Sequence, residues 1–137
     1  MPIVTLTRRE TFAAAHRLHS DALSPEQNTA LFGKCNHTNG HGHNYTLEVT
    51  LRGEVNPETG ILFNLTELKA ILQERVLARV DHRNMNLDIG EFRTLNPTAE
   101  NMAVVFWGWL KASALGSLLH EVRLWETDKN VASYRGE

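Results

Sequence analysis

The sequence predicts an α+β fold, in which helices cover one face of an antiparallel sheet. Apolar and polar residues alternate with the two-residue period of a strand near both ends of the chain. Between these stretches, apolar residues recur at helical spacing in two segments. The predicted order is therefore strand, strand, two helices, strand, strand, and strands outside with helices in the middle are typical of this fold class.

The composition is that of one compact domain. With 137 residues, 42% of them hydrophobic, the chain is long enough for one core and too short for two ordinary ones, so we expect a single domain over residues 1–137. A formal net charge of -2 gives no overall bias toward nucleic acid or membrane. We expect a cytoplasmic protein, because the lone cysteine excludes an internal disulfide and neither a membrane span nor a signal peptide is visible.

The first strand is predicted over residues 3–15, which carry Thr, Val, Ile and Phe. In the connection that follows, Ser24-Pro25-Glu26-Gln27 has the pattern of a capping box with proline at the first helical position, and Gly33 marks the end of that short helix. Cys35 therefore falls in a loop just after a helix end. The second strand is predicted over residues 41–53, where apolar and polar residues alternate.

The middle of the chain is predicted to form a hairpin and two helices. A turn at residues 56–60 is expected to return residues 61–63 as a paired strand. Asn64 then caps a helix that ends near Asp81-His82, and Pro97-Thr98 starts a second helix. The last two strands are expected over residues 122–127 and 131–134.

A histidine pair on the second strand indicates a metal site. His41 and His43 point the same way in an extended strand, and Gly42 between them leaves room for close approach, so they are two ready ligands for Zn²⁺. His16, at the end of the first strand, is the best candidate for a third ligand. Three histidines without an obvious fourth ligand suggest a catalytic zinc, with Cys35 supplying further chemistry. The alternative is a turn with exposed histidines and a small buried cysteine.

A carboxylate on the third predicted strand is the next candidate. Val122, Leu124 and Glu126 share a face that should be apolar, and an isolated buried charge is costly. Glu126 is therefore either paired or available to a ligand, and two parallel N–H donors, such as the 2-amino-pyrimidinone edge of a pterin or guanine, would match it in bidentate fashion. A strand-end glutamate that reaches solvent is the alternative.

Three further groups have two interpretations each. The pair Asp81-His82 is either an ordinary helix-terminal pair or an oriented acid/base couple. Glu100, in the first turn after Thr98, is favoured as a residue that compensates the helix dipole. Arg8 and Arg9 point to opposite faces of a strand, so at most one can face a given site, and a solvated edge is their default role.

Six stretches of the chain, in the same order, resemble the 6-pyruvoyl-tetrahydropterin synthase family, and together they extend over nearly the whole sequence. They are F-A-A-A-H-R-L (12–18), L-F-G-K-C-N-H-T-N-G-H-G-H-N-Y (31–45), N-L-T-E-L-K (64–69), V-D-H-R-N-M-N (80–86), P-T-A-E-N (97–101) and W-E-T-D (125–128).

The resemblance implies a T-fold, a four-stranded antiparallel sheet with two helices between its second and third strands. It also implies trimers whose sheets close into a barrel, and two trimers stacked into a homohexamer with active sites between subunits. Closure would hide the sheet edges that a lone subunit exposes.

Carried over by motif, the resemblance gives each candidate residue a role. A cysteine acting as thiolate implies a pKa lowered by nearby positive charge. The implied roles are His16, His41 and His43 as zinc ligands, Cys35 as general base, Asp81 and His82 as its partners in proton transfer, and Glu126 as the pterin anchor, assisted by Thr98 and Glu100.

The implied reaction converts 7,8-dihydroneopterin triphosphate to 6-pyruvoyl-tetrahydropterin with loss of triphosphate, as in tetrahydrobiopterin biosynthesis. Arg8 or Arg9 is a hypothetical triphosphate contact. The nearest alternative is the 6-carboxy-tetrahydropterin synthase of queuosine biosynthesis, in which three residues separate the cysteine from H-G-H, whereas here residues 36–40 make five. A non-catalytic zinc- or pterin-binding module, with Cys35 closing a four-ligand site, is the alternative of another class.

Overall fold

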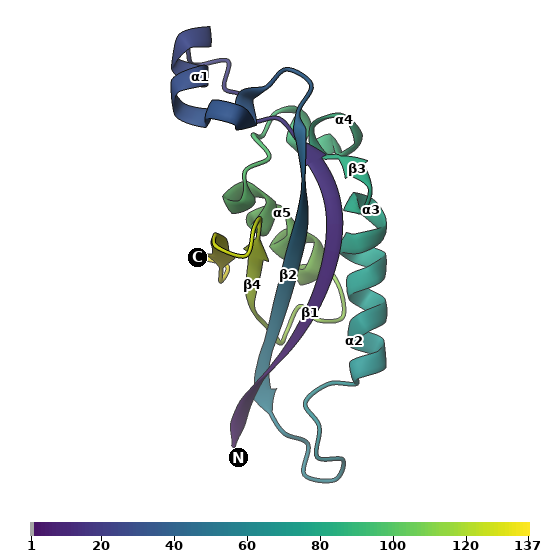
Figure 1. The fold of residues 1–137 in the computed structure, drawn as a ribbon. Helices are drawn as coiled ribbons and strands as arrows, with labels where there is room; N and C mark the ends of the chain where they lie inside the picture. Colours follow the sequence, from purple (N-terminus) through teal and green to yellow (C-terminus); the bar gives the residue numbers. More distant parts are fainter. Residues whose placement is uncertain (1) are drawn as a thin grey trace.

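The structure, a computed structural model, describes residues 2–137. Its centre is a sheet with the strand order β3-β1-β2-β4-β5, and Figure 1 shows the long strands β1 and β2 curving through the length of the molecule. The strands are β1 (Ile3–His16), β2 (His41–Glu54), β3 (Arg83–Asn84), β4 (Leu119–Trp125) and β5 (Val131–Tyr134). The helical segments are α1 (Pro25–Phe32), η1 (Gly33–Asn36), α2 (Leu65–Leu72), η2 (Gln73–Leu77), α3 (Ala78–Val80), α4 (Met85–Asp88), η3 (Gly90–Arg93) and α5 (Ala99–Lys111).

The four antiparallel strands predicted near the two ends of the chain are present, and the fifth strand of the sheet, β3, was not predicted. β3 is only two residues long and pairs in parallel with β1 at Ala14 and Ala15. His82, with a φ of 61°, turns the chain at the end of α3, and its backbone N–H donates to the carbonyl oxygen of Ala13. The chain therefore runs beside β1 for two residues, and no periodicity marks so short a strand.

The β1–β2 pair is the longest strand pair of the sheet. All 14 residues of β1 pair with β2, from Ile3 opposite Glu54 to His16 opposite His41. The predicted alternation on β2 is confirmed, because its apolar residues from Tyr45 to Leu51 are fully buried on one face. Register is strongly specified in such a pair, since a slip of one residue would turn the buried face to solvent.

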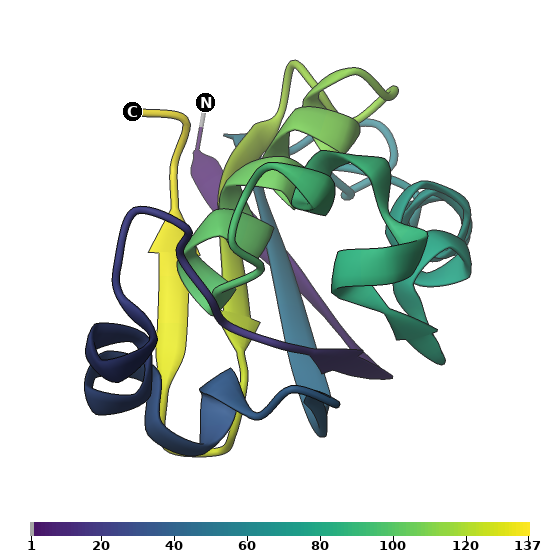
Figure 2. The same ribbon diagram turned by 90° about the horizontal axis from the view of Figure 1, so that it is seen from above.

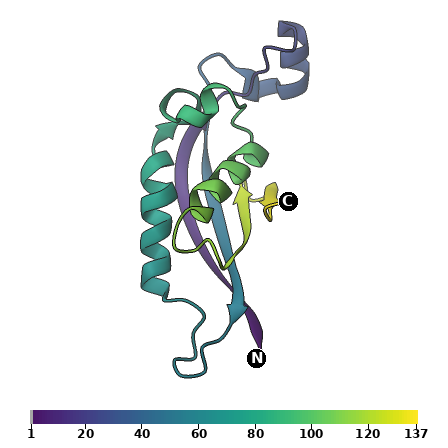
Figure 3. The same cartoon turned by 180° about the vertical axis from the view of Figure 1, so that it is seen from behind.

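The helices cover that buried face. Residues 65–80 form one continuous helical run through α2, η2 and α3, with a π-helical segment at η2, and α5 packs beside it on the same side of the sheet (Figures 2 and 3). The Phe12 and Phe106 rings meet edge to face with centroids 6.0 Å apart and join β1 to α5. None of the helices within residues 2–137 is long and apolar enough to span a membrane.

The predicted strand over residues 61–63 is wrong. This segment is irregular, and the loop before it is closed by the Asn56 N–H, which donates to the carbonyl oxygen of Ile61. β2 has no free edge to offer, because β1 pairs with one side of it and β4 with the other.

The predicted helix starts are confirmed by their caps. Ser24 and Gln27 form the reciprocal capping box of α1, Asn64 accepts from the N–H of Glu67, and Thr98 accepts from the N–H of Asn101. The α1–η1 segment lies at the end of the molecule where β1 ends and β2 begins (Figure 1).

Candidate active site

Three histidines meet where β1 ends and β2 begins. His16 and His41 are directly opposite each other in the ladder, and His43 follows two residues later on the same face. Their candidate ligand atoms all lie within 4.8 Å of one another, and the Nε2 atoms of His41 and His43 are 2.8 Å apart. The predicted grouping is confirmed, and the turn with exposed histidines is excluded because these residues belong to a paired strand.

The surroundings of His16 prepare it as a metal ligand. Its side chain is completely buried, and its Nδ1 lies 2.8 Å from the carbonyl oxygen of Pro97, which can only accept a hydrogen bond. Nδ1 must therefore carry the proton, and Nε2 keeps its lone pair. That Nε2 is buried without a hydrogen-bond partner within residues 2–137. An orphaned, lone-pair-bearing nitrogen beside two other imidazoles fits a metal ion.

The electrostatics favour a neutral ring at His16 and at His43. Burial lowers the pKa of His16, against the opposing effect of the Pro97 carbonyl and of Glu126. Burial also lowers the pKa of His43, although the Glu126 carboxylate raises it. Neutral imidazole is the form that binds a metal, so the three histidines could hold a metal ion.

Glu126 lies beside the histidine cluster. Val122 and Leu124 are buried on the same face of β4, and Glu126 follows just past the strand end with its Oε1 3.4 Å from Nε2 of His43. Its side chain is 20% exposed, so the carboxylate is neither in the core nor freely solvated. The interpretation as a strand-end residue that simply reaches solvent is therefore wrong.

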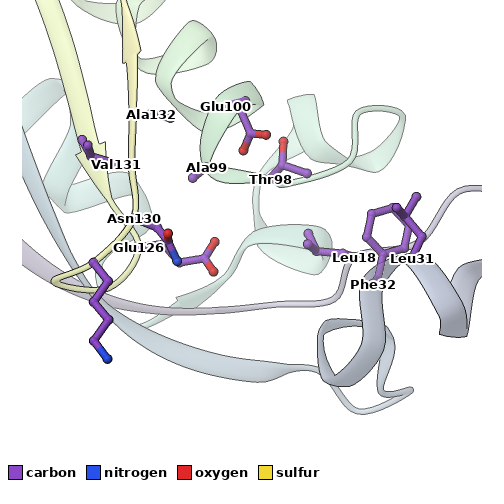
Figure 4. A pocket seen from close by; sticks show the side chains of 11 residues that line it. Leu18, Leu31, Phe32, Thr98, Ala99, Glu100, Glu126, Asn130, Val131 and Ala132 are labelled. Atoms are coloured by element: carbon purple, nitrogen blue, oxygen red, sulfur yellow. The ribbon is translucent and has the colours of Figure 1, made fainter.

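A cavity of about 750 Å³ opens next to this carboxylate (Figure 4). Thr98 and Glu100, at the start of α5, line it from one side, and Glu126 lines it from the β4–β5 connection. The three predicted substrate-binding residues thus share one cavity. The remaining lining residues are Leu18, Leu31, Phe32, Ala99, Lys129, Asn130, Val131 and Ala132.

Cys35 is in η1, directly after α1, and is partly buried. Burial raises the pKa of its thiol, and the Glu126 carboxylate raises it further. In the single chain the charge that acts on Cys35 is thus negative, and the lowering of this pKa by nearby positive charge stays a prediction for the metal-loaded protein. Cys35 does not belong to the three-histidine group.

Asp81 and His82 form the expected oriented pair at the end of α3. Nδ1 of His82 is 3.0 Å from Oδ1 of Asp81, and the Ala13 N–H donates to the same oxygen at 3.0 Å. The pKa of Asp81 is lowered, first by that backbone N–H and then by His82.

Within one chain, His82 borders the same hollow as the metal-ligand candidate His43, and this hollow is not lined by Cys35 or Glu126. The His82 side chain is 82% exposed, and the hollow of about 440 Å³ that it borders is lined from the strands by Ala13, His43 and Asn44, among others. Ala13 and Asn44 point to the face of the sheet that the helices do not cover, whereas His43 belongs to the face of the three-histidine cluster. Within residues 2–137, no hydrogen bond or ion pair joins His82 to Cys35 or to Glu126.

Arg8 and Arg9 point to opposite faces, as predicted. Arg8 pairs with Glu10 at 2.7 Å, and Arg9 pairs with Glu48 at 3.2 Å. Neither arginine lines the cavity beside Glu126. A contact with triphosphate stays a prediction for these residues.

Tyr45 and the Pro97 carbonyl are site features that sequence reasoning missed. The Tyr45 hydroxyl oxygen is 3.3 Å from Nδ1 of His16, and its ring stacks on Phe12. The alternation of β2 placed Tyr45 on the face of His43, so a signal for its position existed. Nothing in the sequence shows which backbone carbonyl meets His16, because that contact joins residues 81 positions apart.

The fold and the site together define the class: an α+β protein with a candidate three-histidine metal site at the end of its longest strand pair. Comparison with known proteins identifies the family. The model of the 6-pyruvoyl tetrahydropterin synthase family matches residues 5–137. The chain belongs to this family, and the predicted T-fold arrangement of sheet and helices is that of its members.

Individual relatives agree with this assignment. The chain is 47% identical to a 6-pyruvoyl tetrahydrobiopterin synthase of Drosophila melanogaster, over 98% of this chain and 81% of the relative, and 44% identical to that of Homo sapiens, over 96% and 91%. The solved structure of the Caenorhabditis elegans 6-pyruvoyl tetrahydropterin synthase has a TM-score of 0.95 and 47% identity, covering 100% of this chain and 98% of that one.

Proposed function

We propose that this protein is a lyase that converts 7,8-dihydroneopterin triphosphate to 6-pyruvoyl-tetrahydropterin, with elimination of triphosphate, in tetrahydrobiopterin-type pterin biosynthesis. One observation carries this proposal: in a member of this family, a partly buried carboxylate, Glu126, lies 3.4 Å from a three-histidine cluster and lines a cavity of about 750 Å³. A pterin substrate needs a carboxylate for its ring and a metal site for its side chain, and here the two are adjacent.

His16, His41 and His43 would hold the cofactor, which we propose to be Zn²⁺. Three neutral imidazoles leave a coordination position open, as in catalytic zinc sites. When bound there, zinc supplies Lewis-acid polarisation of the substrate side chain. The Pro97 carbonyl and the Tyr45 hydroxyl orient His16 through its Nδ1, which would leave Nε2 free to bind the ion.

Glu126 would bind the pterin ring. An ionised carboxylate accepts two parallel hydrogen bonds, which matches the N–H donors of a 2-amino-pyrimidinone. Thr98 and Glu100 face the same cavity and would complete the polar contacts, while Leu18 and Phe32 contribute apolar lining.

Cys35 would act as the general base that takes a proton from a carbon of the substrate side chain, and His82, oriented by Asp81, would return a proton. Within residues 2–137, no hydrogen bond or ion pair joins the Asp81–His82 pair to Cys35, and Cys35 does not line the hollow beside His82, which supports a site shared between subunits. We therefore propose a homohexamer, a dimer of trimers, in which one subunit supplies Cys35 and a neighbour supplies Asp81 and His82. We place the reaction in the cytoplasm, which suits an unpaired thiol.

Incubation of the purified, zinc-loaded protein with 7,8-dihydroneopterin triphosphate tests the proposal. Released triphosphate and a product with the mass of 6-pyruvoyl-tetrahydropterin are expected. Glu126→Gln is the matched variant, since it keeps the shape of the side chain and removes the charge. A 6-carboxy-tetrahydropterin product would assign the protein to the queuosine branch, and pterin binding without triphosphate release would indicate a binding module.

A further inference from the structure

The short segment that follows β1 is held by asparagine side chains. Asn86 makes two hydrogen bonds to the backbone of Arg17, accepting from its N–H at 2.7 Å and donating to its carbonyl oxygen at 2.9 Å. Asn36 donates to the carbonyl oxygen of Leu18 at 2.8 Å, and Asn96 accepts from the N–H of His19 at 3.2 Å. The backbone N–H and carbonyl groups of Arg17 and Leu18 are thus all hydrogen-bonded, although these residues lie outside the strand.

The same segment is tied to Cys35. The Leu18 N–H donates to the carbonyl oxygen of Cys35 at 2.7 Å, and Nε of Arg17 donates to the carbonyl oxygen of Asn36 at 3.0 Å. With the Asn36 side chain on Leu18, three hydrogen bonds join residues 17–18 to residues 35–36. No other hydrogen bond within residues 2–137 links residues 35–36 to β1 or to the segment that follows it, except that of Asn36 to His19.

These three hydrogen bonds, which we call the brace, connect Cys35 to the histidine cluster. Arg17 follows the buried ligand candidate His16 in sequence, so a fixed residue 17–18 backbone sets the place of Cys35 relative to His16. Residues 37–39 of the loop after Asn36 are exposed, so the thiol is restrained by this brace together with the helical segments α1 and η1. A general base must stay within hydrogen-bond reach of its proton, and a small displacement is costly.

We propose that Arg17 and Asn36 are positioning residues that fix Cys35 relative to the three-histidine cluster, with Asn86 fixing Arg17. The proposal rests on the proposed function, in which Cys35 is the general base.

Alkylation provides a direct test, because Cys35 is the only cysteine of the chain and any thiol reagent reports on it alone. The variants are Arg17→Ala and Asn36→Ala, with Arg17→Lys and Asn36→Gln as conservative partners, because glutamine keeps the amide donor. The control is Asn39→Ala, an exposed asparagine of the same loop whose side chain makes no hydrogen bond within the described residues. Each protein is loaded with zinc, its metal content and Tm are measured, and the rates of iodoacetamide alkylation and of turnover are recorded.

Arg17→Ala and Asn36→Ala should be alkylated about threefold faster and should lose about tenfold in kcat with KM nearly unchanged, because the base is displaced while binding is kept. Arg17→Lys should recover most of the rate, and Asn39→Ala should match the unchanged protein. If either alanine variant does not fold, Arg17→Lys and Asn36→Gln carry the test, with smaller effects in the same direction.

Unchanged alkylation and kcat in both alanine variants would overturn the positioning role, and so would an equal effect of Asn39→Ala or a kcat loss explained by lost zinc. The two proposals fail separately. A protein without any turnover contradicts the proposed function, whereas the alkylation rates still decide whether the brace holds the thiol.

Discussion

His16 and His41 are paired across the last rung of the β1–β2 ladder. The metal site is therefore fixed by strand register, because a slip of one residue would send the imidazoles of β1 and β2 to opposite faces of the sheet. The 14-residue ladder that begins with Ile3 opposite Glu54 holds that register over its whole length.

Replacing Tyr45 by phenylalanine should weaken metal binding and leave the fold intact. The hydroxyl near Nδ1 of His16 is lost, while the ring keeps its stacking on Phe12 at a centroid distance of 4.9 Å. We expect the zinc affinity to fall about tenfold, as for other groups that orient a ligand. Competition with a chromophoric chelator measures this, and an affinity equal to that of the unchanged protein would contradict the orienting role.

Glu126→Gln should lower the pKa of the Cys35 thiol. Burial raises this pKa first, and the Glu126 carboxylate adds to it, so removal of the negative charge moves the pKa back toward its ordinary value. The pH profile of iodoacetamide alkylation should shift to lower pH in the metal-free variant. Glu58→Gln, at an exposed turn residue, is the control. An unshifted profile would mean that the two side chains are too far apart to interact.

Glu48→Gln should reduce stability at neutral pH only. The pKa of Glu48 in the folded chain is lowered, chiefly by the hydrogen bond from Nε1 of Trp125, with Arg9 and Arg123 adding to it against burial. A lowered folded-state pKa gives stability that is present above the ordinary glutamate pKa and is lost as the pH falls through the folded-state value. We expect a loss of about 1 kcal/mol at pH 7.

Urea unfolding at neutral pH and at an acidic pH, where Glu48 is protonated in both states, measures this difference. The difference in the free energy of unfolding between Glu48→Gln and the unchanged protein should become smaller at acidic pH. An equal difference at both pH values would mean that packing, and not the charge, makes the contribution.

Phe106→Ala should be among the more destabilising changes. The Phe106 ring is fully buried and contacts Phe12 of β1 as well as Trp109 of its own helix. The cavity left at the junction of sheet and α5 should cost about 3–5 kcal/mol. Denaturant unfolding monitored by circular dichroism gives the value, with Val104→Ala, at an exposed position of the same helix, as the control.

Mixing two inactive variants tests whether the site is shared between subunits. Cys35→Ala and His82→Ala each remove one proposed acid/base group. Subunits exchanged between the two proteins should regain part of the activity, because some interfaces then combine an intact Cys35 with an intact His82. If the mixed oligomers stay inactive, either both groups act within the same subunit or one of them takes no part in the reaction.

The sequence determined the features that depend on local periodicity and on single residues. The β2 alternation, the three helix caps and the shared face of His41 and His43 were predicted, because neighbouring residues fix strand faces and cap hydrogen bonds. The position of Glu126 on the face of Val122 and Leu124 followed from the same rule.

Only the tertiary structure decided the contacts between distant segments. The two-residue β3, the irregular path of residues 61–63, the Pro97 carbonyl on His16 and the Asn36 brace beside Cys35 all depend on which free backbone groups meet after folding. Strand edges and backbone carbonyls look alike in every sequence, so no local pattern marks their partners. The raised pKa of Cys35 has the same origin, because burial and the approach of Glu126 exist only in the folded chain.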